Sequence, residues 1–527
     1  MTAQPGGTST VPSPPDRPRR QLLLASLAAT LAPGWASHAR AADVRRFELG
    51  VASGQPQATT VVLWTRLTGG GLPPQVDVSW ELAEDESFQR IAARGVEVAL
   101  AADAHSVHAE PQGLQPARRY WYRFQALGQS SPVGCTRTAP AADDAVALFQ
   151  FAIASCQRWD TGRYAAWRDV AAHAARDELD AVFFLGDYIY EYASSRAAVR
   201  PVHGGLVRTL DDYRGRYHQY KTDPALQAAH AACPWLVVWD DHEVDNDYAS
   251  LQGQTLQPDF AAQRVAAYRA WWEHMPVAKA MRPVGPDLRI YGRLDWGRLA
   301  RIHLLDDRQY RDVQACPRAG RGGSNTVQLA DCAALSDPRR TLLGAEQERW
   351  LAEGWALDRP WNLLAQQTLM ARFNWEPPAA GGGAASGRFW TDGWDGYPAA
   401  RQRLLDVLQQ RKVPGVVVLG GDMHAHCVAN LLADFDNPQS AVLASEFCGT
   451  SISSLGTPQS RVDAALPLNP HIHWGRADQR GYMRFELRPG ALQAQLRVVA
   501  DANDADSTVS TVARFAVQAG RAGVSRV

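Results

Sequence analysis

Six short apolar stretches constrain the fold of this chain more than any other feature, because each of them ends in polar residues. The stretches are residues 148–154, 181–185, 236–239, 299–305, 361–365 and 416–419. A helical pattern at 164–176 separates the first two. This alternation of strands and helices is typical of layered α/β folds. Because sites in such sheets form at the carboxyl ends of strands, polar residues far apart in the chain can meet there.

Four of these strand ends carry side chains of types that commonly serve as metal ligands. The four groups are Cys156, Asp187, Asp240-Asp241-His242 and Asp422-Met423-His424. A carboxylate can bridge two cations, as hydrolysis of phosphate esters at two-metal sites requires. Asp187 is therefore the first candidate for a bridging ligand. Tyr190, three residues further on, can reach the same ion as a phenolate.

Two histidines separated by one residue follow a Gly-Gly turn at 420–421. On an irregular loop, His424 and His426 can each address a different ion. Together with the thiolate of Cys156 and the phenolate of Tyr190, they suit a transition metal that shares a carboxylate with a second ion. The thiolate and the phenolate favour ferric iron over zinc for the first ion, with a zinc hydrolase as the alternative.

The first 42 residues have the three parts of an export signal. Residues 17–20 are rich in arginine, residues 22–31 are apolar, and Ala39-Arg40-Ala41 is a small-residue cleavage site. The Arg19-Arg20 pair resembles a twin-arginine signal, but Pro18 departs from that motif, so the ordinary secretory route stays open. We expect the export machinery as a partner and a periplasmic or secreted location.

Composition excludes some functions and bounds others. Charged residues make up 21% of the chain and the net charge is −1, which gives no support for nucleic-acid binding through bulk electrostatics. Beyond the signal, no run reaches the roughly 18 apolar residues of a transmembrane helix, so we expect no membrane-spanning segment. Seven cysteines leave at least one unpaired, and Cys156 is our candidate. The pairing of Cys316, Cys332, Cys427 and Cys448 stays open.

At 527 residues the chain is too long for one small core, so we expect two folded units after the signal. Short β-rich runs at 60–64, 76–80 and 120–124 predict a small sandwich over residues 43–142. The α/β pattern predicts a catalytic domain over 143–510, in which residues 481–499 alternate as a terminal hairpin. Residues 511–527 are expected to be a C-terminal tail.

The ordered motifs of the chain resemble those of the PhoD-type alkaline phosphatases, within the calcineurin-like and purple acid phosphatase superfamily. The likeness extends from about Phe47 to Val499. The motifs are residues 50–54, 63–66, 155–156, 186–190, 239–243, 305–311, 394–397, 421–424 and 446–451. The resemblance implies a four-layer α/β metallophosphoesterase sandwich preceded by a small all-β domain of fibronectin or immunoglobulin type. It also implies a centre of iron (Fe³⁺) and calcium (Ca²⁺), with another divalent metal as an alternative.

The resemblance also implies roles for individual residues. The expected iron ligands are Cys156, Asp187, Tyr190 and His426. Asp187 and His424 would face the second ion, together with either Asp241 or Asn246. His242 is expected to donate a hydrogen bond or proton near the leaving group, and Arg308 to contact phosphate. The sequence departs from the family at Asp307, where Thr is common, which weakens the expectation for Arg308.

The function implied is that of an exported alkaline phosphatase acting on a small-molecule phosphoester, a monoester and also a diester. Two cations would offset the charge of the phosphate and acidify a bound water for attack on phosphorus. One alternative is a phosphodiesterase or phospholipase D-like member of the same family. Another is a calcium-stabilised surface binding protein in which the N-terminal sandwich carries out recognition.

Overall fold

The computed structural model describes residues 44–195, 198–376 and 387–527. The expected export signal therefore lies outside the described residues. Residues 45–527 pack as one compact unit instead of the two units that chain length predicted. Within the described ranges, no helix has both the length and the apolar character needed to cross a bilayer.

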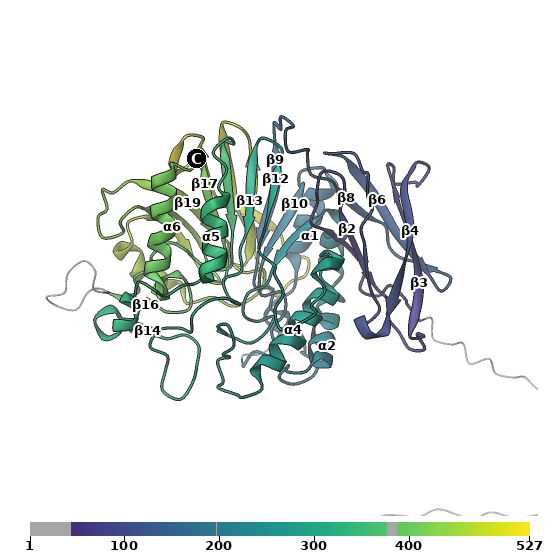
Figure 1. Ribbon diagram of the computed structural model, residues 1–527, viewed down its shortest axis with the longest axis horizontal. Helices are drawn as coiled ribbons and strands as arrows, with labels where there is room; N and C mark the ends of the chain where they lie inside the picture. Colours follow the sequence, from purple (N-terminus) through teal and green to yellow (C-terminus); the bar gives the residue numbers. More distant parts are fainter. Residues whose placement is uncertain (1–43, 196–197, 377–386) are drawn as a thin grey trace, which may run out of the picture. The chain divides into compact units, whose positions relative to one another are not determined.

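The larger of two main sheets contains ten strands (Figure 1). They are β1 Val51–Gly54, β2 Val62–Arg66, β5 Ser106–Ala109, β9 Phe149–Ala154, β10 Ala181–Leu185, β11 Trp235–Val238, β21 Gly481–Leu487, β22 Ala491–Val499, β23 Val509–Gln518 and β24 Arg521–Arg526. Their order is β24-β23-β22-β21-β9-β10-β11-β1-β2-β5. The four central strands from β9 to β1 run parallel, so their carboxyl ends share one edge.

The second sheet contains seven strands. They are β12 Gly292–Trp296, β13 Ala300–Leu304, β15 Trp361–Ala365, β17 Val416–Gly420, β18 His426–Leu432, β19 Val442–Cys448 and β20 Ile472–Arg476. Their order is β12-β13-β15-β17-β19-β18-β20, and the strands from β13 to β19 run parallel. The strands predicted from the apolar stretches are confirmed in both sheets.

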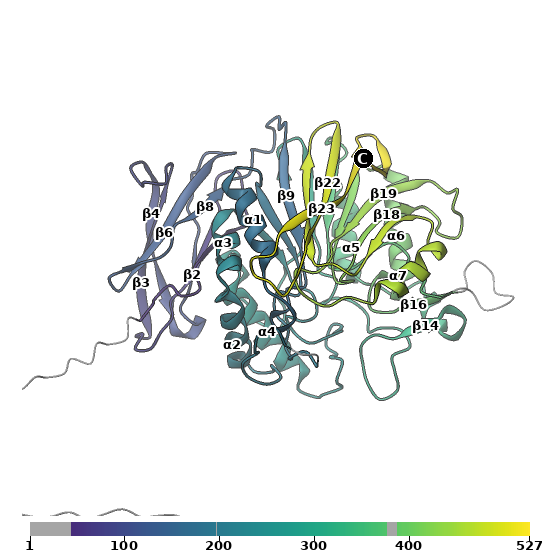
Figure 2. The same ribbon diagram turned by 180° about the vertical axis from the view of Figure 1, so that it is seen from behind.

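Helices cover the outer faces of the two sheets (Figures 1 and 2). The helices are α1 Ala165–Ala175, α2 Leu210–Lys221, α3 Pro224–Ala232, α4 Phe260–His274, α5 Gly344–Gly354, α6 Pro398–Arg411 and the short α7 Gln459–Ala465. Helices α1 to α4 pack on the ten-stranded sheet, and α5 and α6 pack on the seven-stranded sheet. The inner faces meet in one hydrophobic core, to which Phe151 of β9 and Leu363 of β15 both belong. The expected four-layer sandwich is confirmed.

Burial on both faces explains why the central strands read as uninterrupted apolar runs. Every residue of β10, β15 and β17 is buried, because a helical layer covers one face and the opposing sheet covers the other. Local signals set the helix ends. Asp223 caps α3 by accepting hydrogen bonds from two backbone N–H groups, and Pro224 follows at the first helical position.

The N-terminal all-β region is confirmed, but one of its two sheets is not separate from the catalytic domain. Its own five strands are β3 Gln75–Ala83, β4 Ile91–Leu100, β6 Arg119–Ala126, β7 Gln129–Ser130 and β8 Gly134–Arg137. They share a hydrophobic core with β1, β2 and β5. Because β1 pairs in parallel with β11, these three strands extend the ten-stranded sheet. A boundary at residue 142 therefore does not divide two independent units.

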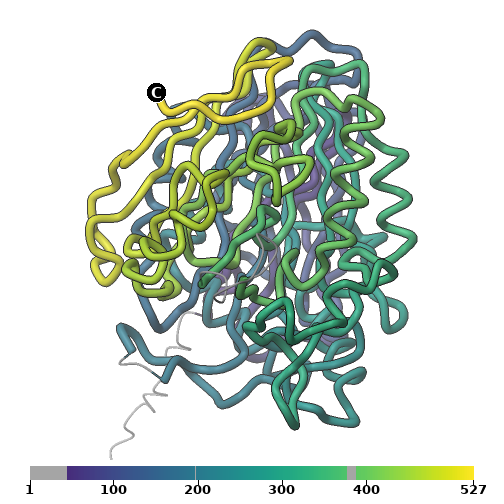
Figure 3. Tube along the Cα trace, turned by 90° about the vertical axis from the view of Figure 1, so that its left-hand side faces the viewer, coloured from purple at the N-terminus to yellow at the C-terminus, as the bar shows by residue number. Residues whose placement is uncertain are grey.

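The expectation of a C-terminal tail at 511–527 is wrong. These residues lie in β23 and β24, which complete one end of the ten-stranded sheet. The predicted hairpin at 481–499 is present as β21 and β22, although two more strands follow it. Figure 3 shows this yellow C-terminal trace along one side of the compact unit. Residues 511–527 form strands because they pair with β22 and with each other, and a short alternating segment does not show in the sequence which strand it will pair with.

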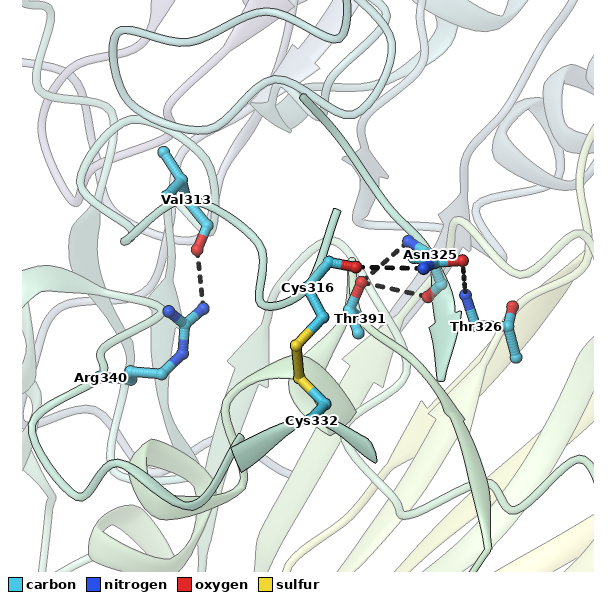
Figure 4. The surroundings of a disulfide bond; sticks show 7 residues. All are labelled: Val313, Cys316, Asn325, Thr326, Cys332, Arg340 and Thr391. Atoms are coloured by element: carbon cyan, nitrogen blue, oxygen red, sulfur yellow. Dashed lines mark hydrogen bonds between the residues drawn. A yellow bond between two sulfur atoms is a disulfide. The ribbon is translucent and has the colours of Figure 1, made fainter. Parts of the chain in front are cut away.

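A disulfide between Cys316 and Cys332 closes the Gly- and Arg-rich loop before α5 (Figure 4). The loop contains the short strand β14 Thr326–Gln328, which pairs with β16 Arg388–Trp390. Among the described cysteines, Cys156, Cys427 and Cys448 are free thiols, as are two others, Cys135 and Cys233. The structure thus selects one of the pairings that the sequence left open.

Replacing both disulfide cysteines by serine is expected to lower the free energy of unfolding by about 3 kcal/mol, because the bond closes a loop of 16 residues. Urea denaturation under non-reducing conditions measures this change. Cys135→Ser, at a free and partly exposed thiol, is the matched control. Equal midpoints for the double variant and the wild type would show that the bond adds nothing to stability.

Lys221, the last residue of α2, is buried with its ammonium group over the rings of Trp64 and Tyr188. Burial lowers the pKa of this ammonium from its usual 10.5 to about 7. At a pH between these two pKa values, Lys221 binds a proton in the unfolded chain but not in the folded protein. The free energy of unfolding therefore rises with pH in this window, by about 1 kcal/mol per pH unit, and this contribution is flat below pH 7.

We expect Lys221→Met to remove this rise while the wild type keeps it. Urea midpoints at several pH values from 7 to 10 measure the slope. Lys412→Met, at an exposed lysine, is the control and is expected to keep the wild-type slope. If the Lys221 variant follows the wild type across the window, the ammonium is not the titrating group.

Candidate active site

The carboxyl ends of strands from both sheets meet at one pocket, as the sequence predicts. Cys156 follows β9, Asp187 follows β10 and Asp240 follows β11, all in the ten-stranded sheet. Asp422 and His424 follow β17 of the facing sheet. The pocket has a volume of about 490 Å³. Its lining includes Asp187, Asp241, His242, Asn246, Asp422 and His424.

Several of these residues have left-handed backbone conformations that residues other than glycine rarely adopt. The φ angles are 59° at Cys156, 60° at Asp187, 63° at Asp422 and 53° at His424. Such conformations cost free energy and cluster at functional sites, where the surrounding structure holds them. Gly186, with φ of 105°, lets β10 turn beside β11: a Cβ there would lie 2.3 Å from the Cβ of Asp240. Close approach of the backbones thus brings the two aspartates together.

Glu243 fixes the backbone of both strand ends. Its carboxylate accepts hydrogen bonds from the N–H groups of Asp187 at 3.1 Å and Asp240 at 2.8 Å, and also from that of Tyr188. Burial raises the pKa of Glu243 to about 7, against these hydrogen bonds, which favour the ionised form. The carboxylate of Glu243 therefore positions the neighbouring aspartates.

A thiol, a carboxylate and an imidazole form the first cluster of metal-binding atoms. One atom each of Cys156, Asp187 and His424 lies within 4.8 Å of the other two. The hydroxyl of Tyr190 donates to Asp187 Oδ2 at 2.8 Å and lies 3.3 Å from His424 Nε2. Burial raises the pKa values of Cys156 and Tyr190 well above their usual range, so binding a cation to them would release protons.

Carboxylates form two further clusters, and Asp187 belongs to both. One contains Asp187, Asp241 and His242, and the other contains Asp187, Asp240 and Asp422. In the second cluster one oxygen of each aspartate is buried without a hydrogen-bond partner. Buried charges need a partner, and a cation supplies one for all three oxygens at once. The residues present therefore fit a metal ion at this position.

Burial and mutual repulsion shape the pKa values of this cluster. Burial raises the pKa values of Asp187 and Asp422 well above their usual range and that of Asp240 to about 7. Burial acts in the same direction on Asp241, but Arg308 and His242 outweigh it and lower the pKa of that carboxyl. Burial lowers the pKa of His424 to about 3, so its imidazole is neutral and free to bind a metal.

His242 differs from the other histidines of the site because acidic groups surround it. Its Nδ1 lies 2.7 Å from Glu191 Oε2, and its ring packs on Tyr190 with the centroids 4.0 Å apart. Burial opposes the charged imidazole, but Glu191, Asp241 and Asp187 outweigh burial and raise the pKa of His242 well above its usual value. These acidic neighbours therefore favour the protonated form of His242.

Two residues lie elsewhere than the sequence predicts. His426, expected with Cys156 and Tyr190, begins strand β18; its Nδ1 accepts a hydrogen bond from the N–H of Thr450, and its Nε2 lies 3.3 Å from the carbonyl oxygen of Arg497. His424, which was expected at the second ion, lies instead beside Cys156 and Asp187. His426 does not line the pocket, whereas His424, at a left-handed position of the loop after β17, does.

Arg308, expected to contact phosphate, has no exposed surface and does not line the pocket. Its guanidinium forms ion pairs with Asp240 and, at 2.7 Å, with Asp392. A third carboxylate, that of Asp241, lies 3.9 Å away. The Arg308 guanidinium is thus engaged in buried ion pairs next to the site, where it balances the charge of acidic residues.

The sequence marked the segments that contain Asp240 and Asp422 without assigning either residue as a ligand, and it did not mark Asp247 and Asp392 at all. The first two have unpartnered oxygens, and the last two form a further acidic cluster with Asp241. A signal for Asp422 was present, because Gly421-Asp422 repeats at β17 the Gly186-Asp187 pair at β10. Nothing comparable marks Asp392, which comes near the others only through the fold.

Comparisons with known proteins agree with this geometry. The model of the family described as PhoD-like phosphatase matches residues 151–496, and that of the PhoD-like phosphatase N-terminal domain matches residues 34–140. The chain is 42% identical to "Alkaline phosphatase D" of Bacillus subtilis (strain 168), over 91% of this chain and 82% of that protein. A solved structure described as "Structure of PhoD" is 40% identical, with a TM-score of 0.84, over 94% of this chain and 93% of the other.

Proposed function

The chain belongs to the PhoD-like phosphatase family and is a phosphoester hydrolase, and on that premise we propose that it is an exported phosphomonoesterase with an iron and calcium centre. Residues 1–42 would direct the export. Membership of a phosphatase family does not favour the alternative of a purely binding protein. The unpartnered oxygens of Asp187, Asp240 and Asp422 are the observation that carries the proposal for the centre.

Chemical differences between the clusters support the choice of metals. Cys156, Asp187, Tyr190 and His424 would hold ferric iron, because thiolate, phenolate and imidazole suit a transition metal. Asp187, Asp240, Asp241, Asp422 and the side-chain oxygen of Asn246 would hold calcium, which prefers oxygen ligands.

When bound, the two ions would offset the negative charge of the phosphate and acidify a water molecule for attack on phosphorus. Asp187, common to three clusters, would hold both ions at a fixed spacing. Glu243 orients Asp187 through its backbone N–H group. This contact is in place before a substrate binds, so catalysis needs little rearrangement of the protein there.

His242 would supply the proton that the departing alcohol needs. Its contact with Glu191 occupies Nδ1, which leaves Nε2 as the nitrogen for a ligand in the pocket. The acidic neighbours of His242 raise its pKa and so favour the protonated imidazole, whose Nε2–H can protonate the leaving oxygen. Breaking the bond between phosphorus and that oxygen releases the alcohol.

Metal analysis and a visible spectrum of the natively exported protein test the centre. We expect iron and calcium, and a charge-transfer band from tyrosinate or thiolate to Fe³⁺. Zinc in a colourless protein would overturn the iron assignment. Turnover of a phosphate monoester, compared with that of a matched diester, tests the reaction class, and faster turnover of the diester would overturn the monoesterase proposal.

A further inference from the structure

The wall of the pocket outside the metal-binding residues has a different chemistry. Apolar and aromatic side chains, threonines and one exposed cation form it, and they come from β14, β16, α7 and the loops beside them. The main members are Thr326, Trp375, Trp390, Leu455, Pro458 and Arg461. A phosphate group bound at the metals would leave this wall to the alcohol part of the ester. The volume of about 490 Å³ is typical of pockets that bind small organic molecules.

Trp390 lies in a short two-stranded ribbon. It is the last residue of β16 and lies directly opposite Thr326 of β14. Next to this pair, the backbone N–H of Asn325 donates to Thr391 Oγ1 at 2.9 Å, and the side-chain amide of Asn325 donates to the carbonyl of Cys316 at 3.1 Å. Figure 4 shows these contacts beside the disulfide. These contacts hold the backbone at Trp390 in place before a ligand binds.

Trp375 forms the second aromatic part of the wall. The backbone N–H of Trp375 donates to the carbonyl of Arg388, the first residue of β16, so both tryptophans depend on the same ribbon. The guanidinium of Arg461, in α7, lies 5.4 Å from the centre of the Trp375 ring. Both tryptophans are partly exposed where they line the pocket, so indole surface is available to a ligand.

We propose that this wall is a subsite for a flat aromatic ring on the leaving alcohol, so that the enzyme prefers phosphomonoesters of ring-bearing alcohols such as nucleosides. This assignment rests on the proposed function and adds the substrate class to it. Planar rings stack on tryptophan because dispersion and quadrupole interactions favour that contact. A preorganised ribbon reduces the entropy cost of binding the ring.

Adenosine 5′-monophosphate and ribose 5-phosphate provide the test, because both esters break at the same primary oxygen and differ in the base. Stacking of a base on an aromatic side chain predicts a wild-type preference in kcat/KM of about 10- to 100-fold for the nucleotide. Most of the difference should appear in KM. Trp390→Leu and Trp375→Leu are expected to lower this preference about tenfold, whereas turnover of ribose 5-phosphate stays within about twofold of the wild type.

Two further measurements separate loss of the subsite from loss of folding. Trp390→Phe keeps an aromatic face and is expected to restore most of the preference. Quenching of tryptophan fluorescence by adenosine reports ring binding without turnover and should weaken in the leucine variants. Equal kcat/KM for the two esters in the wild type, or a parallel loss for both in the variants, would overturn the subsite. Absence of hydrolysis of either ester by the metal-loaded wild type would instead overturn the proposed function.

Discussion

Asp187→Ala is expected to reduce kcat/KM for phosphate-ester hydrolysis by about 10³-fold or more. Each tenfold change corresponds to 1.36 kcal/mol, and a metal ion contributes several kcal/mol of transition-state stabilisation at such sites. Asp187 is the residue shared by the three clusters that meet at the pocket, so its loss affects both proposed ions. Steady-state kinetics, with the metal content of each preparation measured in parallel, gives the size of the effect.

The stability of the same variant distinguishes a catalytic from a structural role. In the metal-free protein the carboxyl group of Asp187 is buried among Asp240, Asp241 and Glu243. Burial is the largest cause that raises its pKa, and these three acidic groups raise the pKa further. Removing the carboxyl group relieves repulsion, so the chelator-treated variant should melt no lower than the chelator-treated wild type. Asp177→Ala, at an exposed aspartate with φ of 59°, controls for alanine in a left-handed conformation. Full activity with normal metal content would refute the bridging role.

Arg308→Met is expected to lower the free energy of unfolding by about 3–5 kcal/mol, because it leaves buried carboxylates without their counter-charge. Arg308 is completely buried and pairs with Asp240 and Asp392. The second of these carboxylates also pairs with Arg311 at 2.5 Å, so the change affects a connected network. Chemical denaturation of the metal-free protein measures the loss without the contribution of bound ions.

Arg298→Met is the matched control, since Arg298 is exposed and its substitution should change stability by no more than about 0.5 kcal/mol. Combining Arg308→Met with Asp392→Leu should cost less than the sum of the single changes, because the double variant removes both charges of a pair. Strict additivity, or a single Arg308 variant as stable as the wild type, would show that the network does not balance charge as described.

The positions of the strands and of the first ligands followed from the sequence for a physical reason. Strands buried on both faces are apolar throughout, so β10 and β17 are visible as runs, and the residues that end each run must lie at one edge of a sheet. Cys156 and Asp187 could be assigned to the pocket on that ground. The resemblance to a family then supplied the layer architecture and the reaction.

The features that the sequence did not predict depend on side-chain direction and on long-range contacts. The hydrophobic periodicity of a sequence carries no information about either. Whether His424 or His426 lies beside Cys156 depends on the path of the loop after β17, in which Asp422 and His424 both have left-handed backbones. The ion pairs of Arg308 depend on Asp392, 84 positions away in the chain. The joining of β1 to β11 likewise needs a long-range pairing that neither short strand specifies. The last two of these differences concern contacts between distant segments, and the first concerns the path of one loop; none concerns the type of a local element.

The ten-stranded sheet draws strands from both ends of the chain, which affects how the protein can be synthesised. Strand β9 pairs with β21, so one of its edges stays open until residues beyond 480 have left the ribosome. An open edge invites pairing with other chains. A nascent chain that has reached His424 would thus hold all the proposed metal ligands but an incomplete sheet. Emergence of β21, and not translation of the last ligand, would therefore set the moment at which this sheet can close around the site.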